Sequence, residues 1–223
     1  MIRAKKFFIG IILAFLSGRS VCAQDYEKVN SNIGGILSLP VSSTSNLVNT
    51  SWGLVGGVGY NFSRHHAVVG EFMWSALYPS ESSIQSIRVG FNDNGITGHS
   101  NLYALTGNYR YESQGNRFGA YFIGGGGWYF RTMGFSKPVI SGSSVPCSPS
   151  FEWWGFSCSG GTVTANQRVK DNNSSVLGGN AGLGFTLKVA DPSYRVYVEP
   201  RYHYAPTKNI STHIVEVSVG LRY

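Results

Sequence analysis

Segments of about 9 to 13 residues that alternate bulky apolar side chains with small or polar ones recur along this chain. In residues 51–62, Trp52, Leu54 and Tyr60 share one face of an extended strand, and Gly53 and Gly57 lie on the other. A period of two is typical of β-strands whose faces meet different surroundings. No window shows convincing helical periodicity, so the pattern predicts an all-β chain.

We count eight such segments. They cover residues 31–40, 51–62, 66–77, 101–111, 116–132, 176–188, 194–204 and 213–223. Strands of this length can cross a bilayer, because a strand tilted by about 45° spans the hydrocarbon core with about 9 to 11 residues. The facing of the fifth strand stays open, since four glycines follow one another at residues 124–127.

The volumes of the two faces decide which one points inward. Eight strands enclose only enough space for modest side chains, and the bulky faces, with repeated Trp, Tyr and Phe, would overfill it. The small face must therefore line the interior, and only lipid would accept the bulky face outside. We expect an eight-stranded antiparallel up-and-down transmembrane β-barrel over residues 24–223.

The connections between the strands support the same topology. Those after the second, fourth and sixth strands, at residues 63–65, 112–115 and 190–193, are short. Those after the third and fifth strands, at residues 78–100 and 133–175, are long and rich in Ser, Gly and Asn. This alternation is typical of short periplasmic turns and longer outer loops, with both termini on the periplasmic side.

The first 23 residues have the order of a secretory signal peptide. Arg3, Lys5 and Lys6 precede an apolar stretch at residues 7–16, and small and polar residues follow up to Ala23. The apolar stretch has about half the length of a spanning helix. We expect cleavage before Gln24 and a single barrel domain after it.

The net charge of +7 falls once the signal peptide is removed. The peptide contains four basic residues and no acid, so 14 basic and 11 acidic residues remain of the 18 and 11 in the whole chain. A mature charge of +3 argues against a nucleic-acid partner. We also expect no cofactor and no metal site.

Two cysteines, Cys147 and Cys158, remain after the signal peptide with Cys22 is lost. They lie in one long outer connection of an exported chain, an oxidising setting in which we expect a disulfide. Such a ring would stabilise the loop by about 3 kcal/mol on the chain-entropy model. Free or metal-binding thiols are the weaker interpretation, because no partner His or Cys-x-x-Cys pattern accompanies them.

The closing strand ends in an aromatic residue, Tyr223, after four alternating apolar positions in residues 215–222. It resembles the terminal strand that the bacterial outer-membrane assembly machinery reads. Together with residues 52–62 (WGLVGGVGYNF), Gly-Glu-Phe at 70–72 and the glycines before Trp128, it resembles the outer membrane protein beta-barrel domain family, which includes OmpA-like, OmpW-like and opacity-like members. The resemblance implies a fold and an outer-membrane location, whereas family members differ in activity.

Seven polar or charged residues are expected to face the lumen. They are Glu71, Asn108, Arg110, Glu199, Arg201, Glu216 and Arg222. Because each charge in a narrow interior must be paired or hydrated, we interpret them first as salt bridges that fill the barrel and fix strand register. A gated path for solutes is the alternative.

One enzymatic alternative rests on His203, beside Arg201 and Tyr202. Its neighbourhood is similar to that of the histidine in outer-membrane lipid A deacylases, a class of lipid-modifying hydrolases that carries an activating serine two residues later. Here that position is Ala205. Glu199 and Glu216 could act as paired carboxylates, but the neighbouring Arg201 and Arg222 favour ion pairs. We therefore expect no catalytic residue.

Four aromatic residues lie between the two cysteines: Phe151, Trp153, Trp154 and Phe156. They suggest either a contact surface for an extracellular protein, glycan or lipid headgroup, or a lid over the barrel mouth. The first functional hypothesis is a non-enzymatic, monomeric barrel in outer-membrane lipid that acts through its outer loops. The second is a narrow, porin-like channel for small or hydrophobic solutes, as in OmpW-like proteins.

Overall fold

The computed structural model describes most of the chain after the predicted signal peptide. The described residues are 27–115, 117–140, 149–152, 155–158, 164–189, 194–207 and 211–223. The predicted signal peptide, residues 1–23, lies outside them, as do Cys147, Trp153 and Trp154.

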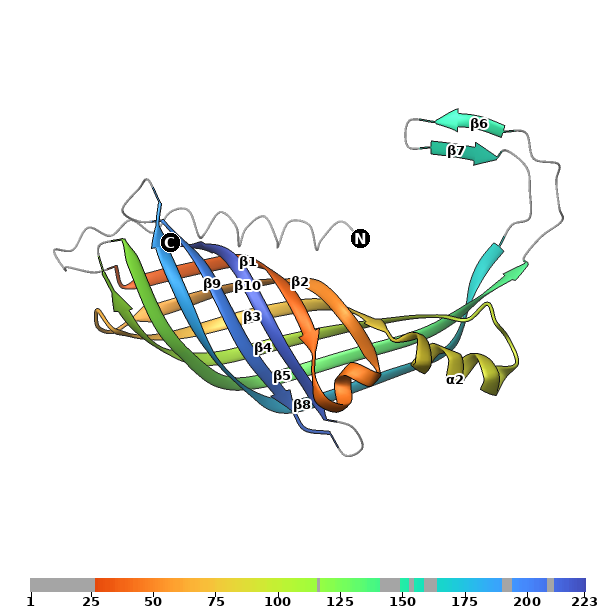
Figure 1. Cartoon of the computed structure of the whole chain (residues 1–223), viewed down its shortest axis with the longest axis horizontal. Helices are drawn as coiled ribbons and strands as arrows, with labels where there is room; N and C mark the ends of the chain where they lie inside the picture. The colour runs from red at the N-terminus through yellow and green to blue at the C-terminus, as the bar shows by residue number, and fades with distance from the viewer. Residues whose placement is uncertain are drawn as a thin grey trace, which may run out of the picture.

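Eight strands of the described chain form one closed antiparallel barrel, which confirms the predicted fold (Figure 1). Each barrel strand pairs with the next barrel strand along the chain, and β1 pairs with β10 to close the ring. The strands are β1 (Val29–Pro40), β2 (Val48–Asn61), β3 (His66–Pro79), β4 (Thr97–Gln114), β5 (Phe118–Ile140), β8 (Thr164–Lys188), β9 (Arg195–Ala205) and β10 (Thr212–Arg222).

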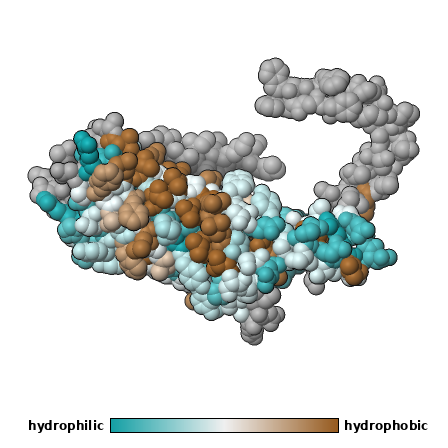
Figure 2. All heavy atoms as spheres, in the orientation of Figure 1, coloured by the Kyte–Doolittle hydropathy of each residue, from teal (hydrophilic) through white to brown (hydrophobic). Residues whose placement is uncertain are grey.

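The bulky face of each strand points outward. Trp52 and Leu54 of β2 are 52% and 53% exposed, whereas Ser51 on the opposite face is 4% exposed. Figure 2 shows apolar side chains grouped over the strands of the barrel, in a band away from the loops. A closed barrel with such a surface satisfies its backbone hydrogen bonds internally and presents apolar side chains to lipid.

The pairing of β5 with its neighbours resolves the facing that the sequence left open. Tyr121 and Tyr129 are buried in the lumen, while Phe122 and Trp128 are exposed on the outer surface. Gly125 is the register partner of Asn108, so it belongs to the lumen face. The glycine run thus gives the lumen space beside large tyrosines.

Glycines on the lumen face are required where polar side chains cross the interior. A Cβ atom on Gly57 would lie 2.6 Å from Cγ of Glu71 and 2.8 Å from the carbonyl oxygen of Gly70. On Gly56, the next residue along β2, the nearest heavy atom would be 3.7 Å away. The neighbouring positions differ because one faces the filled lumen and the other faces outward.

The two ends of the barrel differ as the connection lengths predicted. At one end, called here the inner end, short turns join β2 to β3, β4 to β5 and β8 to β9. At the other, the outer end, lie the 3-10 helix η1 (Ser42–Asn46), helix α2 (Glu81–Phe91) and a separate hairpin of β6 (Pro149–Glu152) and β7 (Gly155–Cys158) (Figure 1).

Two expectations about the outer end were wrong. Strands β5 and β8 do not stop at residues 132 and 176 but run on to Ile140 and back from Thr164, paired with each other throughout. The β8 half of the extension, residues 164–175, is polar. Strand pairing outside a membrane needs no alternation between apolar and small residues. The predicted connection of residues 133–175 is thus partly a β-ribbon.

Helix α2 was also not predicted. The hydroxyl of Ser80 caps it by accepting a hydrogen bond from the backbone N–H of Ser83, and Asn92 ends it in the left-handed conformation, at φ 49°. Glu81 in the first turn forms an ion pair of 2.6 Å with Arg88 in the last. These local signals stabilise a helix. Among the described residues, no helix is long and apolar enough to cross a membrane.

Candidate functional site: the polar lumen

The structure places all seven sequence-predicted lumen residues inside the barrel. Their side chains belong to β3, β4, β9 and β10, and the exposed fraction of each residue lies between 2% and 6%. They do not form one cluster, because they divide into three groups along the barrel axis.

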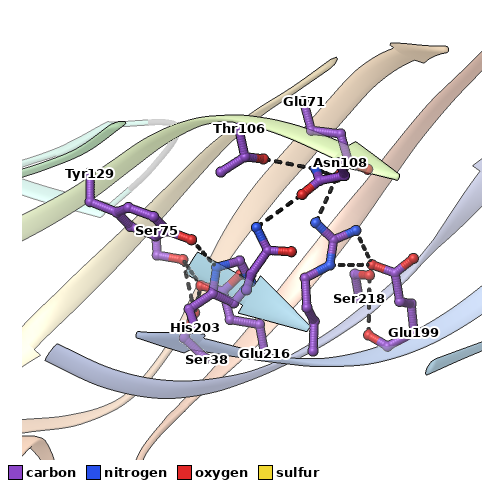
Figure 3. A network of polar contacts seen from close by, with 12 residues as sticks. Ser38, Glu71, Ser75, Thr106, Asn108, Tyr129, Glu199, His203, Glu216 and Ser218 are labelled. Atoms are coloured by element: carbon purple, nitrogen blue, oxygen red, sulfur yellow. Dashed lines mark hydrogen bonds and ion pairs between the residues drawn. The ribbon is translucent and has the colours of Figure 1, made fainter. Parts of the chain in front are cut away.

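The central group is built around the guanidinium of Arg201 and includes Glu71, Asn108 and Glu199, which are labelled in Figure 3. It forms an ion pair of 2.6 Å with Glu71 and donates from Nε to Oε1 of Glu199 at 2.8 Å. The side-chain amides of Asn32 and Asn108 donate to the two oxygens of Glu71 at 3.0 and 2.7 Å. One arginine is therefore shared by two carboxylates from different strands.

Asn108 extends this group across the interior to β8. Its carbonyl oxygen accepts a hydrogen bond of 3.0 Å from the amide of Asn180, and its own amide also donates to the hydroxyl of Thr106 at 2.9 Å. Buried polar networks gain strength as their members are satisfied, and here most polar atoms are paired, although Oδ1 of Asn32 and Oδ1 of Asn180 have no hydrogen-bond partner in the described chain. The network links β1, β3, β4, β8 and β9, so it fixes their relative register.

The second group lies closer to the outer end and is centred on Glu216 (Figure 3). Oε1 accepts hydrogen bonds of 3.3 Å from the hydroxyls of Ser38 and Ser75, and Oε2 lies 3.4 Å from Nε2 of His203. On its other side, Nδ1 of His203 is 2.9 Å from the hydroxyl of Tyr129. Apolar side chains surround this group and fill the outer half of the lumen, among them Ile36, Val48, Met73, Leu77, Leu102 and Ile214.

The third group lies at the inner end. Arg110 and Arg222 both approach Oε2 of Glu112, at 3.2 and 3.5 Å. The Arg222 guanidinium also lies over the ring of Tyr121, 4.3 Å from its centroid, and 5.2 Å from that of Tyr197. Cation–π contacts of this kind hold a guanidinium in a fixed orientation.

The packed side chains leave little free space at the centre of the barrel. A cavity of about 20 Å³ remains between the central and outer groups, with room for about one water molecule. A much larger cavity of about 590 Å³ opens at the inner mouth, below Arg110 and Arg222. Among the described residues, the centre thus contains no wide path.

The polar lumen does not assemble the catalytic groups that the lipid hydrolase alternative would need. His203 is 4% exposed and contacts Tyr129 and Glu216, and Ala205 beside it is buried. Glu199 and Glu216 are held by separate partners, Arg201 and the two serines. No group of His, Cys, Asp and Glu in the described chain could hold a metal ion.

Several lumen residues were missed by the sequence interpretation. Glu112 was assigned to a turn, but β4 continues to Gln114 and Glu112 is buried in the lumen. It stands two and four residues after Arg110 and Asn108, so one further step of the same alternation would have found it. Tyr121 and Tyr129 were not included because the facing of the fifth strand was left open, and His203 was considered only in the hydrolase alternative.

The outer connection contains the remaining predicted residues. Phe151 of β6 and Phe156 of β7 are register partners in the small hairpin, as are Pro149 and Cys158. The predicted disulfide depends on Cys147, outside the described residues, and so remains a prediction.

Solved structures with the same barrel are known. Ail, the attachment invasion locus protein of Yersinia pestis, is 14% identical with a TM-score of 0.51, over 89% of this chain and 100% of Ail. A major outer membrane protein of Thermus thermophilus is 7% identical with a TM-score of 0.53, over 88% of this chain and 99% of that protein. Neisserial surface protein A is 12% identical with a TM-score of 0.49, over 88% and 96%. The first two likenesses show the barrel fold.

No curated protein sequence is significantly similar to this chain. The outer membrane protein beta-barrel domain family, in contrast, matches residues 11–223. The closed eight-stranded barrel, its apolar outer surface and this match agree with one another. The chain therefore belongs to the outer membrane protein beta-barrel domain family and resides in the outer membrane.

Proposed function

We propose that this chain is a non-enzymatic barrel with a closed lumen that contacts partners outside the cell through its outer extension. The observation that carries the proposal is the length of β5 and β8, 23 and 25 residues, against 11 residues in β9 and β10. The two long strands rise as a ribbon beyond the rest of the wall (Figure 1). A barrel with a purely structural role in the membrane would not need this ribbon.

Among the described residues, no strand pairs with the second edge of the outer part of β8. Residues 164–178 pair with β5 on one side, and the pairing of β8 with β9 begins only at Gly179 with Tyr204. Free strand edges pair with extended segments of other proteins. Arg168 and Asp171, which form an exposed ion pair of 3.0 Å on this edge, would select the partner and discourage self-association.

The packed lumen supports the same proposal, because it leaves little room for a solute to pass. Its centre is filled by paired charges, and its outer half by apolar side chains. The narrow-channel alternative would need these groups to move apart. The lipid hydrolase alternative would need an accessible His203, which is buried.

We further propose that β10, ending near Tyr223, is read by the outer-membrane assembly machinery. The strand closes the barrel against β1 from Asn32 with Arg222 to Pro40 with Ile214. Its two edges pair with β1 and with β9, so a partner that held β10 by an edge would keep the ring open.

A shortened variant tests the main proposal. Met133 and Asn172 are register partners, so residues 134–171 can be replaced by an Asn-Gly turn that suits a hairpin. We expect the variant to fold, to keep heat-modifiable gel migration, and to lose retention of its proteoliposomes on immobilised extracellular proteins and glycans. The control variant replaces residues 81–95, the α2 loop, by a short linker and keeps the ribbon. Full retention by the ribbon-deleted variant would refute the proposed role of the extension.

A further inference from the structure

The cavity at the inner mouth of the barrel has a marked excess of positive charge. Among the described residues that line its volume of about 590 Å³, five carry guanidinium or ammonium groups and two carry carboxylates. The excess persists when a terminal carboxylate at Tyr223 is counted. The cations are Arg64, Arg110, Lys188, Arg195 and Arg222.

The floor of this cavity contains two arginines and one carboxylate. Arg110 and Arg222 are 3% and 5% exposed and share Glu112. The contacts are poorly aligned: Nε of Arg110 lies 3.2 Å from Oε2 of Glu112 without meeting hydrogen-bond geometry, and in the described chain Nε of Arg222 has no hydrogen-bond partner. Buried guanidiniums are normally satisfied by carboxylates or phosphates in bidentate geometry, so this floor has one positive charge too many.

The floor is also rigid. Tyr121 and Tyr197 hold Arg222 by their ring faces, and the Tyr121 hydroxyl is anchored by a hydrogen bond of 2.6 Å to Glu199. The guanidinium is thus oriented before any ligand arrives, which reduces the entropy cost of binding.

The rim supplies further cations on adjoining strands. Lys188 ends β8, and Arg195, its register partner, begins β9. Within the described part of the chain, Arg195 makes long contacts, of 3.5 Å to the hydroxyl of Thr186 and 3.4 Å to the carbonyl of Gly115. Its side chain can turn toward an anion in the cavity without breaking a strong interaction.

We propose that the inner mouth of the barrel binds a multivalent oxyanion of the phosphate type. A single negative charge would neutralise only the excess charge of the floor, whereas a multivalent anion would also pair with the cations of the rim, Lys188 and Arg195. The cavity volume is in the range that takes a small molecule, about 300 to 1,000 Å³. The phosphate can be free in solution or carried by a lipid headgroup at the inner surface of the membrane.

Titration of the folded mature chain with inorganic pyrophosphate tests this proposal. The protein is held in a maltoside detergent, which contains no phosphate, and binding is followed by calorimetry and by phosphorus NMR. We expect saturable binding. The double variant Lys188→Gln with Arg195→Gln should bind about tenfold more weakly or worse, because it removes two charge-assisted contacts.

The matched control is Arg88→Gln with Arg168→Gln, which removes the same charge from the outer end. It should keep the wild-type affinity. Heat-modifiable migration shows that both variants are folded. Absence of saturable binding by the wild type, or equal weakening in the two double variants, would overturn the proposal. The source of the phosphate is assigned by adding phosphatidylglycerol to the micelles: competition with pyrophosphate identifies the headgroup, and unchanged affinity identifies a soluble phosphate.

Discussion

The two faces of the barrel wall are made by alternate residues of the same strands, yet they follow opposite rules. The outer face contains single apolar side chains such as Leu183, 55% exposed, whose neighbour in the membrane is lipid. The lumen face contains glycines and long charged side chains that depend on named partners, such as Arg201 with Glu71 and Glu199. Many apolar residues would therefore suit a position on the outer face, whereas a position in the lumen requires a particular residue that fits its partners in one strand register.

The largest effect is expected from removing the cation of the central ion pairs in the lumen. Arg201→Met leaves two buried carboxylates without their cation and should lower the free energy of unfolding by about 3 to 5 kcal/mol. Urea titration in lipid vesicles measures this. The triple variant that also carries Glu71→Leu and Glu199→Leu should regain most of the loss, because no buried charge stays unpaired in the central group. A loss below about 0.5 kcal/mol for Arg201→Met would mean that water reaches this group freely.

A charge on the outer face should cost slightly less. Leu183→Arg places a guanidinium against the hydrocarbon and should lower the free energy of unfolding in vesicles by about 2 to 4 kcal/mol. Val89→Arg is the matched control: Val89 is 71% exposed in α2, outside the barrel wall, and the change there should stay within about 0.5 kcal/mol. Equal effects of the two changes would show that the faces are assigned wrongly.

Two adjacent glycines give the closest comparison between the faces. Gly57→Ala directs a methyl group at Glu71 and at the Gly70 carbonyl, and should lower the free energy of unfolding by about 1 to 3 kcal/mol through overpacking. Gly56→Ala directs the same methyl group outward, and its effect should lie within about 0.5 kcal/mol. If Gly56→Ala is the more damaging variant, β2 is shifted by one residue.

The smallest effect on the barrel is expected from the outer connection. We predict that Cys147 and Cys158 form an intramolecular disulfide, and mass spectrometry of the unreduced protein checks it. Cys147→Ala with Cys158→Ala should change the free energy of unfolding of the barrel by less than about 0.5 kcal/mol, because the bond restrains only the loop. It should weaken retention by any partner that the aromatic residues between the cysteines contact. Two free thiols in fresh envelopes would contradict the prediction.

Alternation predicted the barrel because a wall between lipid and a narrow lumen imposes a period of two on every strand. Alternation did not predict the segments that lie outside the membrane-spanning wall. The ribbon of β5 and β8 lies beyond the wall, where neither face has to match lipid or a narrow lumen and no regular alternation results. Helix α2 is set by caps at Ser80 and Asn92 rather than by an apolar stripe.

For the polar lumen too, alternation predicted which residues face inward but not all of their contacts. Glu71, Arg201 and Glu216 could be assigned to the lumen from their position in the strands, and the expected pair of Arg201 with Glu199 is present. The expected pair of Glu216 with Arg222 is not, because Arg222 contacts Glu112 instead. Pairing between strands depends on which strands face each other across the interior. The burial of Tyr121 beside Gly184 is similar: a Cβ atom at Gly184 would overlap the tyrosine ring, and this complementarity appears only once the strand register is known.

Single-channel recording in planar bilayers tests most directly whether the lumen is closed. The wild-type protein, inserted and shown to be folded by heat-modifiable migration, should give no steady conductance, because paired charges fill the centre and apolar side chains fill the outer half. The triple variant Arg201→Ala with Glu71→Ala and Glu199→Ala should also give no steady conductance, because the apolar side chains still fill the outer half of the lumen. A steady ohmic conductance of the wild type, with ordered single-channel steps, would contradict the account.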